Sequence, residues 1–118
     1  MQTKNELGRL GEELAVRFMR ERGYEILERN WRYSRNEIDI IAVKDNKIHF
    51  IEVKTRTTTR YGLPEEAVSE IKIGFLLKAG EAFLFEHPEY KKVQIDVLAI
   101  CMLPSEEIEY FLIEDVYY

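Results

Sequence analysis

The chain of 118 residues has few of the features that mark secreted or repetitive proteins. Its only cysteine, Cys101, cannot form an internal disulfide, so nothing in the sequence requires an oxidising compartment. Cys101 lies in an apolar run, where a buried and unreactive thiol is expected. No internal repeat, low-complexity tract or linker rich in proline and glycine is present. The length suits one hydrophobic core, which predicts a single domain spanning residues 1–118.

Long hydrophobic runs are also missing. No apolar stretch approaches the roughly 20 residues that cross a bilayer, and the amino-terminal stretch "MQTKNELGRLGEE" is charged throughout. We therefore expect a soluble cytoplasmic protein with no membrane partner. The two histidines, His49 and His87, have no cysteine or second histidine at ligand spacing, so neither is predicted to bind a metal.

The sequence lacks the basic excess that is typical of nucleic-acid-binding proteins, because its net charge is −5. This acidic excess lies in residues 104–118, which contain five acids and no lysine or arginine. The rest of the chain is neutral and carries two local basic segments, "RNWRYSR" and "KTRTTTR". These segments could face a phosphate backbone, so the charge distribution permits a nucleic-acid partner without requiring one.

Hydrophobic periodicity predicts an α/β fold. From about Asn5 to Arg22, leucines and other apolar residues recur at spacings of three and four residues. This pattern indicates an amphipathic helix ended by Gly23. A second helix is predicted over residues 65–85, with Pro64 at its start and Pro88 beyond its end. Strands are predicted over residues 24–31, 37–43, 47–53, 92–102 and 109–116. The order of helix, three strands, helix and two strands predicts a mixed five-stranded sheet flanked by helices.

A tight turn at Asp45-Asn46 would bring two acidic residues together. Both turn residues tolerate positive φ, so a two-residue hairpin turn is favoured here. The register that follows places Asp39 opposite Glu52 and Lys54 opposite Glu37. Directly opposed side chains have Cβ atoms about 4.5–5.5 Å apart. The two acids of the otherwise apolar strands are therefore predicted to be neighbours.

Two facing carboxylates on a partly dry surface remain ionised only if a cation or strong donors compensate them. A divalent metal would do so, and oxygen ligands of this kind suit Mg²⁺. The alternative is structural: Lys54 neutralises Glu52 or pairs across to Glu37, and a three-residue turn would break the register. The spacing of these residues leaves both interpretations open.

The motifs "GRLGEELA", "NEIDIIA", "FIEVKTR", "YGLPEEAV" followed by Lys72, and "IDVLAI" occur in this order over nearly the whole chain. Together they resemble the small bacterial YraN-like family, which is similar in core pattern to archaeal Holliday junction resolvases. The acid Asp39 followed by Glu52-Val53-Lys54 also resembles the signature of the restriction-endonuclease-like superfamily. One departure is Asn36, where the family usually has glycine; asparagine also accepts positive φ.

The resemblance implies a restriction-endonuclease-like core and a metal-dependent DNA endonuclease. Asp39 and Glu52 would hold Mg²⁺ or Mn²⁺, helped by the backbone carbonyl of Val53. Lys54 would position or deprotonate the attacking water and counter the charge that builds on the phosphate. Hydrolysis of a phosphodiester needs both an activated water and neutralisation of negative charge, which explains these residue types.

Glu12 is a candidate for a further acid of the site. Helical periodicity places it beside the buried stripe near Ala15 and Met19, while Glu13 points more nearly to solvent. The resemblance to the resolvases implies that Glu12 completes the metal site directly or through water. The alternative is an exposed helical acid that pairs with Arg9 or Arg17.

Several cations and aromatic residues are candidates for contacts to nucleic acid. Arg56 and Arg60 directly follow the predicted site, and Lys72 matches a family position, so phosphate contacts are expected for them as for Arg35. An ordinary solvated loop or helical ion pair is the alternative. Trp31 and Tyr33 could stack on an unpaired base or close the core. Asp96, an acid within a strand, is predicted to have a structural role, with the first helix as its suggested partner.

The sequence leads to a first hypothesis and two rivals. The first is a structure-selective or otherwise weakly sequence-specific DNA endonuclease that uses Mg²⁺, with junction-like substrates suggested by analogy and a homodimer needed to cut two strands symmetrically. The second is a noncatalytic nucleic-acid-binding or adaptor module that retains the fold. The third is an interaction protein in which the acids form salt bridges.

Overall fold

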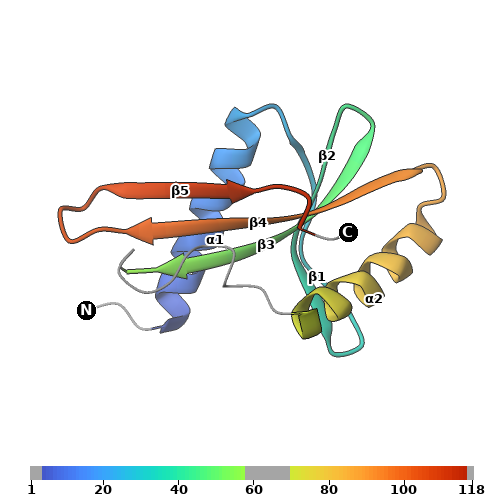
Figure 1. Cartoon of the computed structure of the whole chain (residues 1–118), viewed down its shortest axis with the longest axis horizontal. Coiled ribbons are helices and arrows are strands. Elements are labelled where there is room, and N and C mark those ends of the chain that lie inside the picture. The colour runs from blue at the N-terminus through green and yellow to red at the C-terminus, as the bar shows by residue number, and fades with distance from the viewer. Residues whose placement is uncertain (1–3, 58–69, 117–118) are drawn as a thin grey trace.

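The structure of the protein is a computed structural model, which describes residues 4–57 and 70–116 (Figure 1). One five-stranded sheet has the strand order β1-β2-β3-β4-β5, with two helices packed against it. The elements are α1 (Lys4–Glu21), β1 (Glu25–Tyr33), β2 (Asn36–Lys44), β3 (Lys47–Arg56), α2 (Glu70–Glu86), β4 (Lys92–Met102) and β5 (Ile108–Ile113). The predicted α/β class and the predicted order of elements are confirmed.

The sheet is mixed. β1, β2 and β3 pair in antiparallel fashion, β3 and β4 are parallel, and β5 pairs antiparallel with β4. Parallel strands need a crossover connection, and α2 lies in the one between β3 and β4. The predicted start of this helix, before Glu70, lies outside the described residues. The last strand stops at Ile113, earlier than predicted, and Asp115 has a positive φ of 55°.

The end of α1 follows the sequence prediction. Gly23 has a φ of 90°, its N–H donates to the carbonyl of Arg20, and the N–H of Tyr24 donates to the carbonyl of Met19. This pair of hydrogen bonds is the Schellman motif, in which glycine takes the left-handed conformation at low cost. The motif turns the chain so that Tyr24 is buried and β1 begins at once.

The turn between β2 and β3 also forms as predicted. Asp45 and Asn46 have φ values of 53° and 63°, as a type I′ hairpin turn requires. The predicted register is present from the turn as far as the pair Ile40–Ile51. Among the described residues, backbone pairing between the two strands ends at this pair. Beyond it, β2 diverges from β3 (Figure 1). The position of Asp39 is therefore the branch point of the sheet.

The two faces of the sheet are covered by different helices. In Figure 1, α1 lies behind the strands β3 to β5. The cluster on the α1 face consists of Ala15, Val16, Met19, Tyr24, Ile40, Ala42, Ile51, Leu98 and Ile100. The cluster on the α2 face consists of Ile38, Ile41, Ile48, Phe50, Leu76, Ala79, Phe83 and Ile95. A Cβ at Gly80 would overlap the ring of Phe50, so glycine allows α2 to pack closely on β3.

Of the helices in residues 4–57 and 70–116, none is long and apolar enough to cross a membrane.

Candidate functional site

The site begins where β2 leaves β3. The backbone N–H of Val53 donates a hydrogen bond to Oδ2 of Asp39, with an N···O distance of 2.8 Å. A side-chain carboxylate thus accepts the hydrogen bond of a β3 N–H beyond the last described backbone pair of the two strands. This bond fixes the Asp39 carboxyl group at the branch point of the sheet.

Close packing of α1 brings a second acid to the same place. A Cβ at Gly11 would overlap the side chain of Thr55, so the absence of a side chain lets α1 approach β3 here. Glu12, the next residue, is half-buried, and its Oε2 accepts a hydrogen bond of 3.0 Å from Nδ2 of Asn30. Asn30 has a φ of 52°, a left-handed conformation that asparagine tolerates better than most residues. These contacts hold Glu12 on the sheet side of α1.

Three carboxylates converge at the branch point. One oxygen each of Glu12, Glu37 and Asp39 lies within 4.8 Å of the others. We call these three residues the carboxylate triad. Glu37 also forms an ion pair with Arg32, at an N···O distance of 3.0 Å. Convergent carboxylate oxygens are the donor set that Mg²⁺ and Mn²⁺ prefer, so the residues of the triad fit such an ion.

The electrostatics of Asp39 reflect this crowding. Burial, followed by the negative charge of Glu52, raises the pKa of Asp39 to about 7. The hydrogen bond from Val53 opposes this rise, while Glu12 and Glu37 add to it. A cation at the triad would favour the ionised carboxylate and lower this pKa again.

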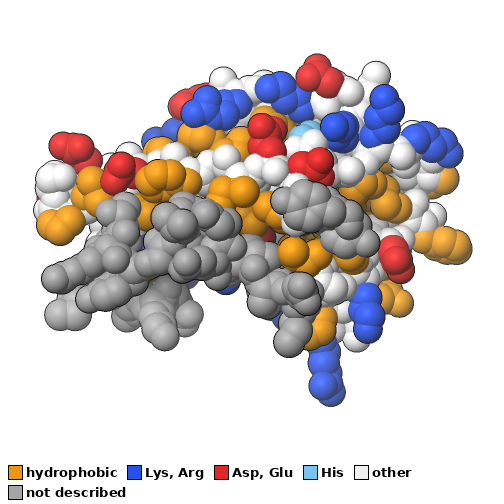
Figure 2. All heavy atoms as spheres, in the orientation of Figure 1, with side chains coloured by type: hydrophobic (Ala, Val, Ile, Leu, Met, Phe, Trp, Pro, Cys, Tyr) orange, Lys and Arg blue, Asp and Glu red, His pale blue; other side chains and the backbone are white. Residues whose placement is uncertain are grey.

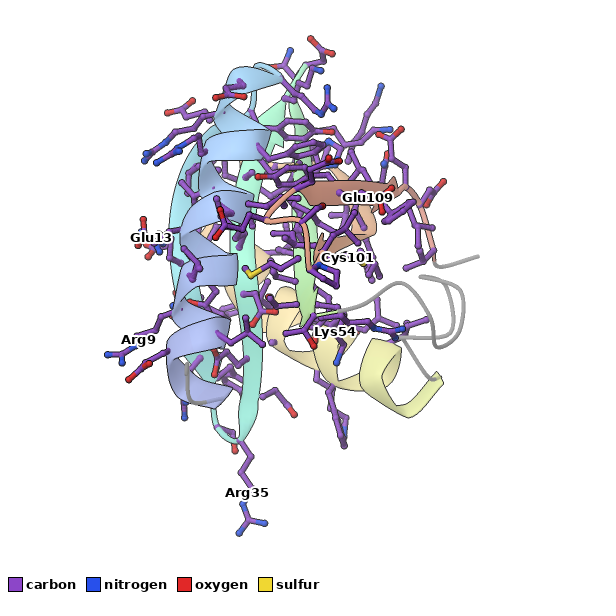
Figure 3. All side chains as sticks on the ribbon, turned by 90° about the vertical axis from the view of Figure 1, so that its left-hand side faces the viewer. Arg9, Glu13, Arg35, Lys54, Cys101 and Glu109 are labelled. Atoms are coloured by element: carbon purple, nitrogen blue, oxygen red, sulfur yellow. The ribbon has the colours of Figure 1, made fainter. Side chains whose placement is uncertain are left out.

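Glu52 and Lys54 lie on the neighbouring strand. Glu52 is buried, and Nζ of the half-buried Lys54 lies 3.7 Å from its Oε1. The ion pair between Lys54 and Glu52 that the sequence offered as an alternative is therefore present. Figure 3 shows Lys54 between α1 and α2. Glu52 is outside the carboxylate triad, although it is close enough to raise the pKa of Asp39.

The two neighbouring acids of α1 have different surroundings, as predicted. Glu13 is exposed and forms an ion pair of 2.7 Å with Arg29, which lowers the pKa of Glu13. Figure 3 shows Glu13 and Arg9 on the outer face of α1, turned away from the sheet. Glu12 instead joins the triad. The helical periodicity thus distinguished the two acids correctly.

Glu37 was not among the predicted ligands, because the predicted register gave it Lys54 as a partner. The structure gives Glu37 the contact with Arg32 and places it beside Asp39. A usable signal was the separation of two residues along one strand, which puts side chains 37 and 39 on the same side.

Of the candidate phosphate contacts, the side chains of Arg35 and Arg56 lie in the described part of the chain. Arg35 extends from the tip of the β1–β2 hairpin (Figure 3), and Arg56 ends β3 and is partly buried. Arg60 lies outside the described residues, as does the side chain of Lys72. Trp31 packs edge-on against Phe83 with ring centroids 5.6 Å apart and thus belongs to the core. Tyr33 is exposed.

A separate polar network lies on β3 and β4. Oδ2 of the fully buried Asp96 lies 2.7 Å from Nδ1 of His49, and Oδ1 accepts hydrogen bonds from Nε2 of Gln94 and the backbone N–H of Asp115. Asp96 therefore has the predicted structural role, but it binds β3 and the carboxyl-terminal segment rather than α1. Cys101 is buried, and burial raises the pKa of its thiol, in agreement with the predicted inert cysteine.

Comparison with known proteins shows the family of this chain. The model of "Uncharacterised protein family UPF0102" matches residues 11–100. The chain belongs to the UPF0102 family. This match confirms the YraN-like family that the motifs indicated, and its span includes the carboxylate triad, Glu52 and Lys54.

Relatives in the UPF0102 family come from several bacteria. A UPF0102 protein of Syntrophomonas wolfei is 48% identical over 96 residues, which cover 80% of this chain and 84% of the relative. One from Flavobacterium psychrophilum is 39% identical over 119 residues, covering 100% of this chain and 98% of the relative. One from Bacteroides thetaiotaomicron is 44% identical over 97 residues, covering 82% and 75%. The similarity to UPF0102 proteins thus extends over most or all of the chain.

Proposed function

We propose that this UPF0102 protein is a DNA endonuclease that depends on Mg²⁺ or Mn²⁺ and hydrolyses phosphodiester bonds. The observation that carries the proposal is the convergence of Glu12, Glu37 and Asp39 within 4.8 Å at the branch point of the sheet. The proposal is supported by Lys54, which pairs with Glu52 on the adjacent strand and supplies an ammonium group near the site.

The donor set determines which residues would hold the ion. Glu12, Glu37 and Asp39 offer carboxylate oxygens, which match the preference of Mg²⁺ and Mn²⁺ for hard ligands. Glu52 and the carbonyl of Val53, which the resemblance implies as ligands, lie on the next strand. Burial, followed by the charge of Glu52, raises the pKa of Asp39, and a bound cation would offset both effects by stabilising the ionised carboxylate.

When bound, a divalent ion supplies an activated water and stabilises charge on the phosphate. The residues of the chain do the rest. Lys54 is held by Glu52 and can counter the negative charge that builds on the scissile phosphate. Asp39 must lose its proton before it can act as a ligand, and its bond from Val53 holds the carboxylate in position for this.

The proposed substrate is DNA of branched or otherwise irregular structure, as in the resolvases that the motifs resemble. Local cations, rather than a uniformly basic surface, would contact the phosphates. On the face seen in Figure 2, basic and acidic side chains are interspersed along the upper edge. Arg35, Arg56, Arg60 and Lys72 are the proposed contacts. A homodimer is proposed for symmetric cutting of two strands, because the described residues of one chain contain one triad.

The experiment that tests this proposal is cleavage of labelled junction, flap, single-stranded and duplex DNA with Mg²⁺ or Mn²⁺. We expect cutting that EDTA abolishes and that Asp39→Asn and Glu37→Gln each reduce by at least about 100-fold. Glu13→Gln is the matched control, because Glu13 lies next to the triad in sequence but outside it in space. Absence of cutting under all conditions, or equal cutting by the Asp39 variant, contradicts the proposal.

A second candidate function is a noncatalytic nucleic-acid-binding or adaptor module. It is favoured by the two ion pairs at the site, in which Arg32 already neutralises Glu37 and Lys54 contacts Glu52. This function predicts DNA binding that weakens steeply with salt and is not followed by cleavage. Calorimetric titration with Mn²⁺ tests a purely structural role for the acids, because fully salt-bridged carboxylates would bind no metal.

A further inference from the structure

An open pocket of about 260 Å³ adjoins the carboxylate triad on the α2 side. Its lining combines two acids of the triad with an amide, a guanidinium-bearing side chain and apolar groups. The lining residues are Arg35, Asn36, Glu37, Asp39, Phe75 and Leu76. The pocket therefore lies between the start of β2, the β1–β2 turn and the first described part of α2.

Phe75 is unusual among the residues that line this pocket. It is 48% exposed, whereas its neighbour Leu76 is fully buried in the core beneath α2. Packing of α2 on the sheet does not explain a large aromatic ring at this position, because Leu76 and Phe83 already supply the buried face. The ring of Phe75 instead lies at the rim of a pocket that also contains Asp39.

We propose that Phe75 stacks on an unpaired nucleobase of the DNA strand whose scissile phosphate lies at the divalent ion held by the carboxylate triad. This inference rests on the proposed function and specifies its substrate class: a strand with at least one unstacked base next to the cut. Every nucleobase has a flat π-face, so stacking on an aromatic ring tolerates any sequence. The amide of Asn36 in the same pocket can hydrogen-bond to a base edge.

The composition of the pocket favours a nucleic acid over an apolar protein surface. A protein segment packed on Phe75 would also cover Asp39 and the ion pair of Glu37 with Arg32, and removing charged groups from water is costly. A nucleotide brings a base for the ring and a phosphate for the triad with its ion. A base in intact duplex is already stacked on both sides and cannot offer its face without being flipped out. Unpaired DNA is therefore the preferred ligand of this pocket.

The test compares Phe75→Ala with Phe85→Ala. Phe85 lies on the same helix and is 89% exposed, but it does not line the pocket at the triad. DNA affinity is measured in Ca²⁺ with single-stranded, flapped and duplex oligonucleotides that carry 2-aminopurine at the candidate unpaired position. Circular dichroism and thermal unfolding of each variant verify that the fold is retained.

We expect Phe75→Ala to weaken binding of single-stranded and flapped DNA at least about fivefold and to remove the quenching of 2-aminopurine. Duplex binding should not change, and the dependence of affinity on salt should keep its slope, because no charge is removed. Phe75→Trp should restore the quenching. Phe85→Ala should bind all three DNAs as the unmodified protein does.

Equal binding of unpaired DNA by Phe75→Ala and the unmodified protein overturns the inference, and so does an equal loss in Phe85→Ala. The result separates this inference from the proposed function. Cutting that requires Asp39 but is indifferent to Phe75 removes only the stacking role. Base stacking that requires Phe75, in a protein that never cuts, supports the stacking role and removes the nuclease.

Discussion

Oδ2 of Asp39 lies 2.8 Å from the backbone nitrogen of Val53 and accepts its hydrogen bond. This bond ties the side chain of one strand to the backbone of the next at the point where described pairing ends. It also holds a carboxyl group beside Glu12 and Glu37, in surroundings that raise the pKa of Asp39 to about 7. The same hydrogen bond thus connects β2 to β3 and fixes the position of the Asp39 carboxyl group in the site.

The first prediction concerns stability and pH in the absence of metal. The pKa of Asp39 is about 7 in the folded protein and about 3.9 in an unfolded chain. Between about pH 3.9 and about pH 7 the folded state binds more protons than the unfolded chain, so the stability of the protein falls as pH rises. The contribution of protonated Asp39 to stability is lost above about pH 7. Asp39→Asn keeps an oxygen to accept the hydrogen bond from Val53 but cannot ionise. Denaturant unfolding at pH 5 and pH 8 should show a smaller fall for Asp39→Asn than for the unmodified protein.

The second prediction concerns metal binding. Because binding must displace the proton of Asp39, affinity for Mn²⁺ should rise with pH up to about pH 7 and then level off. A saturating ion should therefore increase the melting temperature more at pH 8 than at pH 5.5. Asp39→Asn and Glu37→Gln should lose most of this increase, while Glu13→Gln should keep it. A pH-independent affinity would show that Asp39 is not a ligand.

The third prediction tests the close approach of α1. Gly11→Ala places a methyl group against Thr55 and should destabilise the protein by about 1–3 kcal/mol. Because Glu12 moves with α1, the variant should also bind Mn²⁺ more weakly. Gly8→Ala is the control on the same helix, since nothing lies near a Cβ at that position. It should be neutral or stabilising by up to about 1 kcal/mol, with unchanged metal affinity.

The fourth prediction separates the buried network of Asp96 from the site. Asp96→Ala leaves His49 and the N–H of Asp115 without their buried acceptor and should cost about 3–5 kcal/mol in stability. Glu89→Ala is the comparison: it removes an exposed ion pair with His87 and should lower the stability by less than about 1 kcal/mol. Loss of Mn²⁺ affinity in a still-folded Asp96→Ala protein, measured by calorimetry, would contradict the separation of the two regions.

Local chemistry made several parts of this fold predictable. Gly23 ends α1 because only a left-handed residue completes the hydrogen bonds there, and Asp45-Asn46 sets the register of β2 and β3 because both residues adopt positive φ. The bounds of β4 also agree with its apolar run. The orientation of Glu12 toward the sheet and of Glu13 toward solvent followed from helical periodicity.

The sequence predicted only part of the carboxylate triad. The register placed Asp39 opposite Glu52, but the paired ladder ends before them, and Glu37 rather than Glu52 is in the triad. The divergence of two strands depends on the twist of the whole sheet, which a strand pattern does not encode. The position of Phe75 in the pocket could not be predicted either, because it depends on how α2 packs against β2.

The sequence by itself determined the elements, their order, the hairpin register and the family, because these depend on residue preferences and periodicities over a few positions. Only the tertiary structure decided that Glu12, Glu37 and Asp39 meet, that Lys54 contacts Glu52, and that Phe75 adjoins the acids. These contacts depend on the distance between α1 and β3 and on the point at which β2 leaves β3. Such distances are set by packing of the whole core.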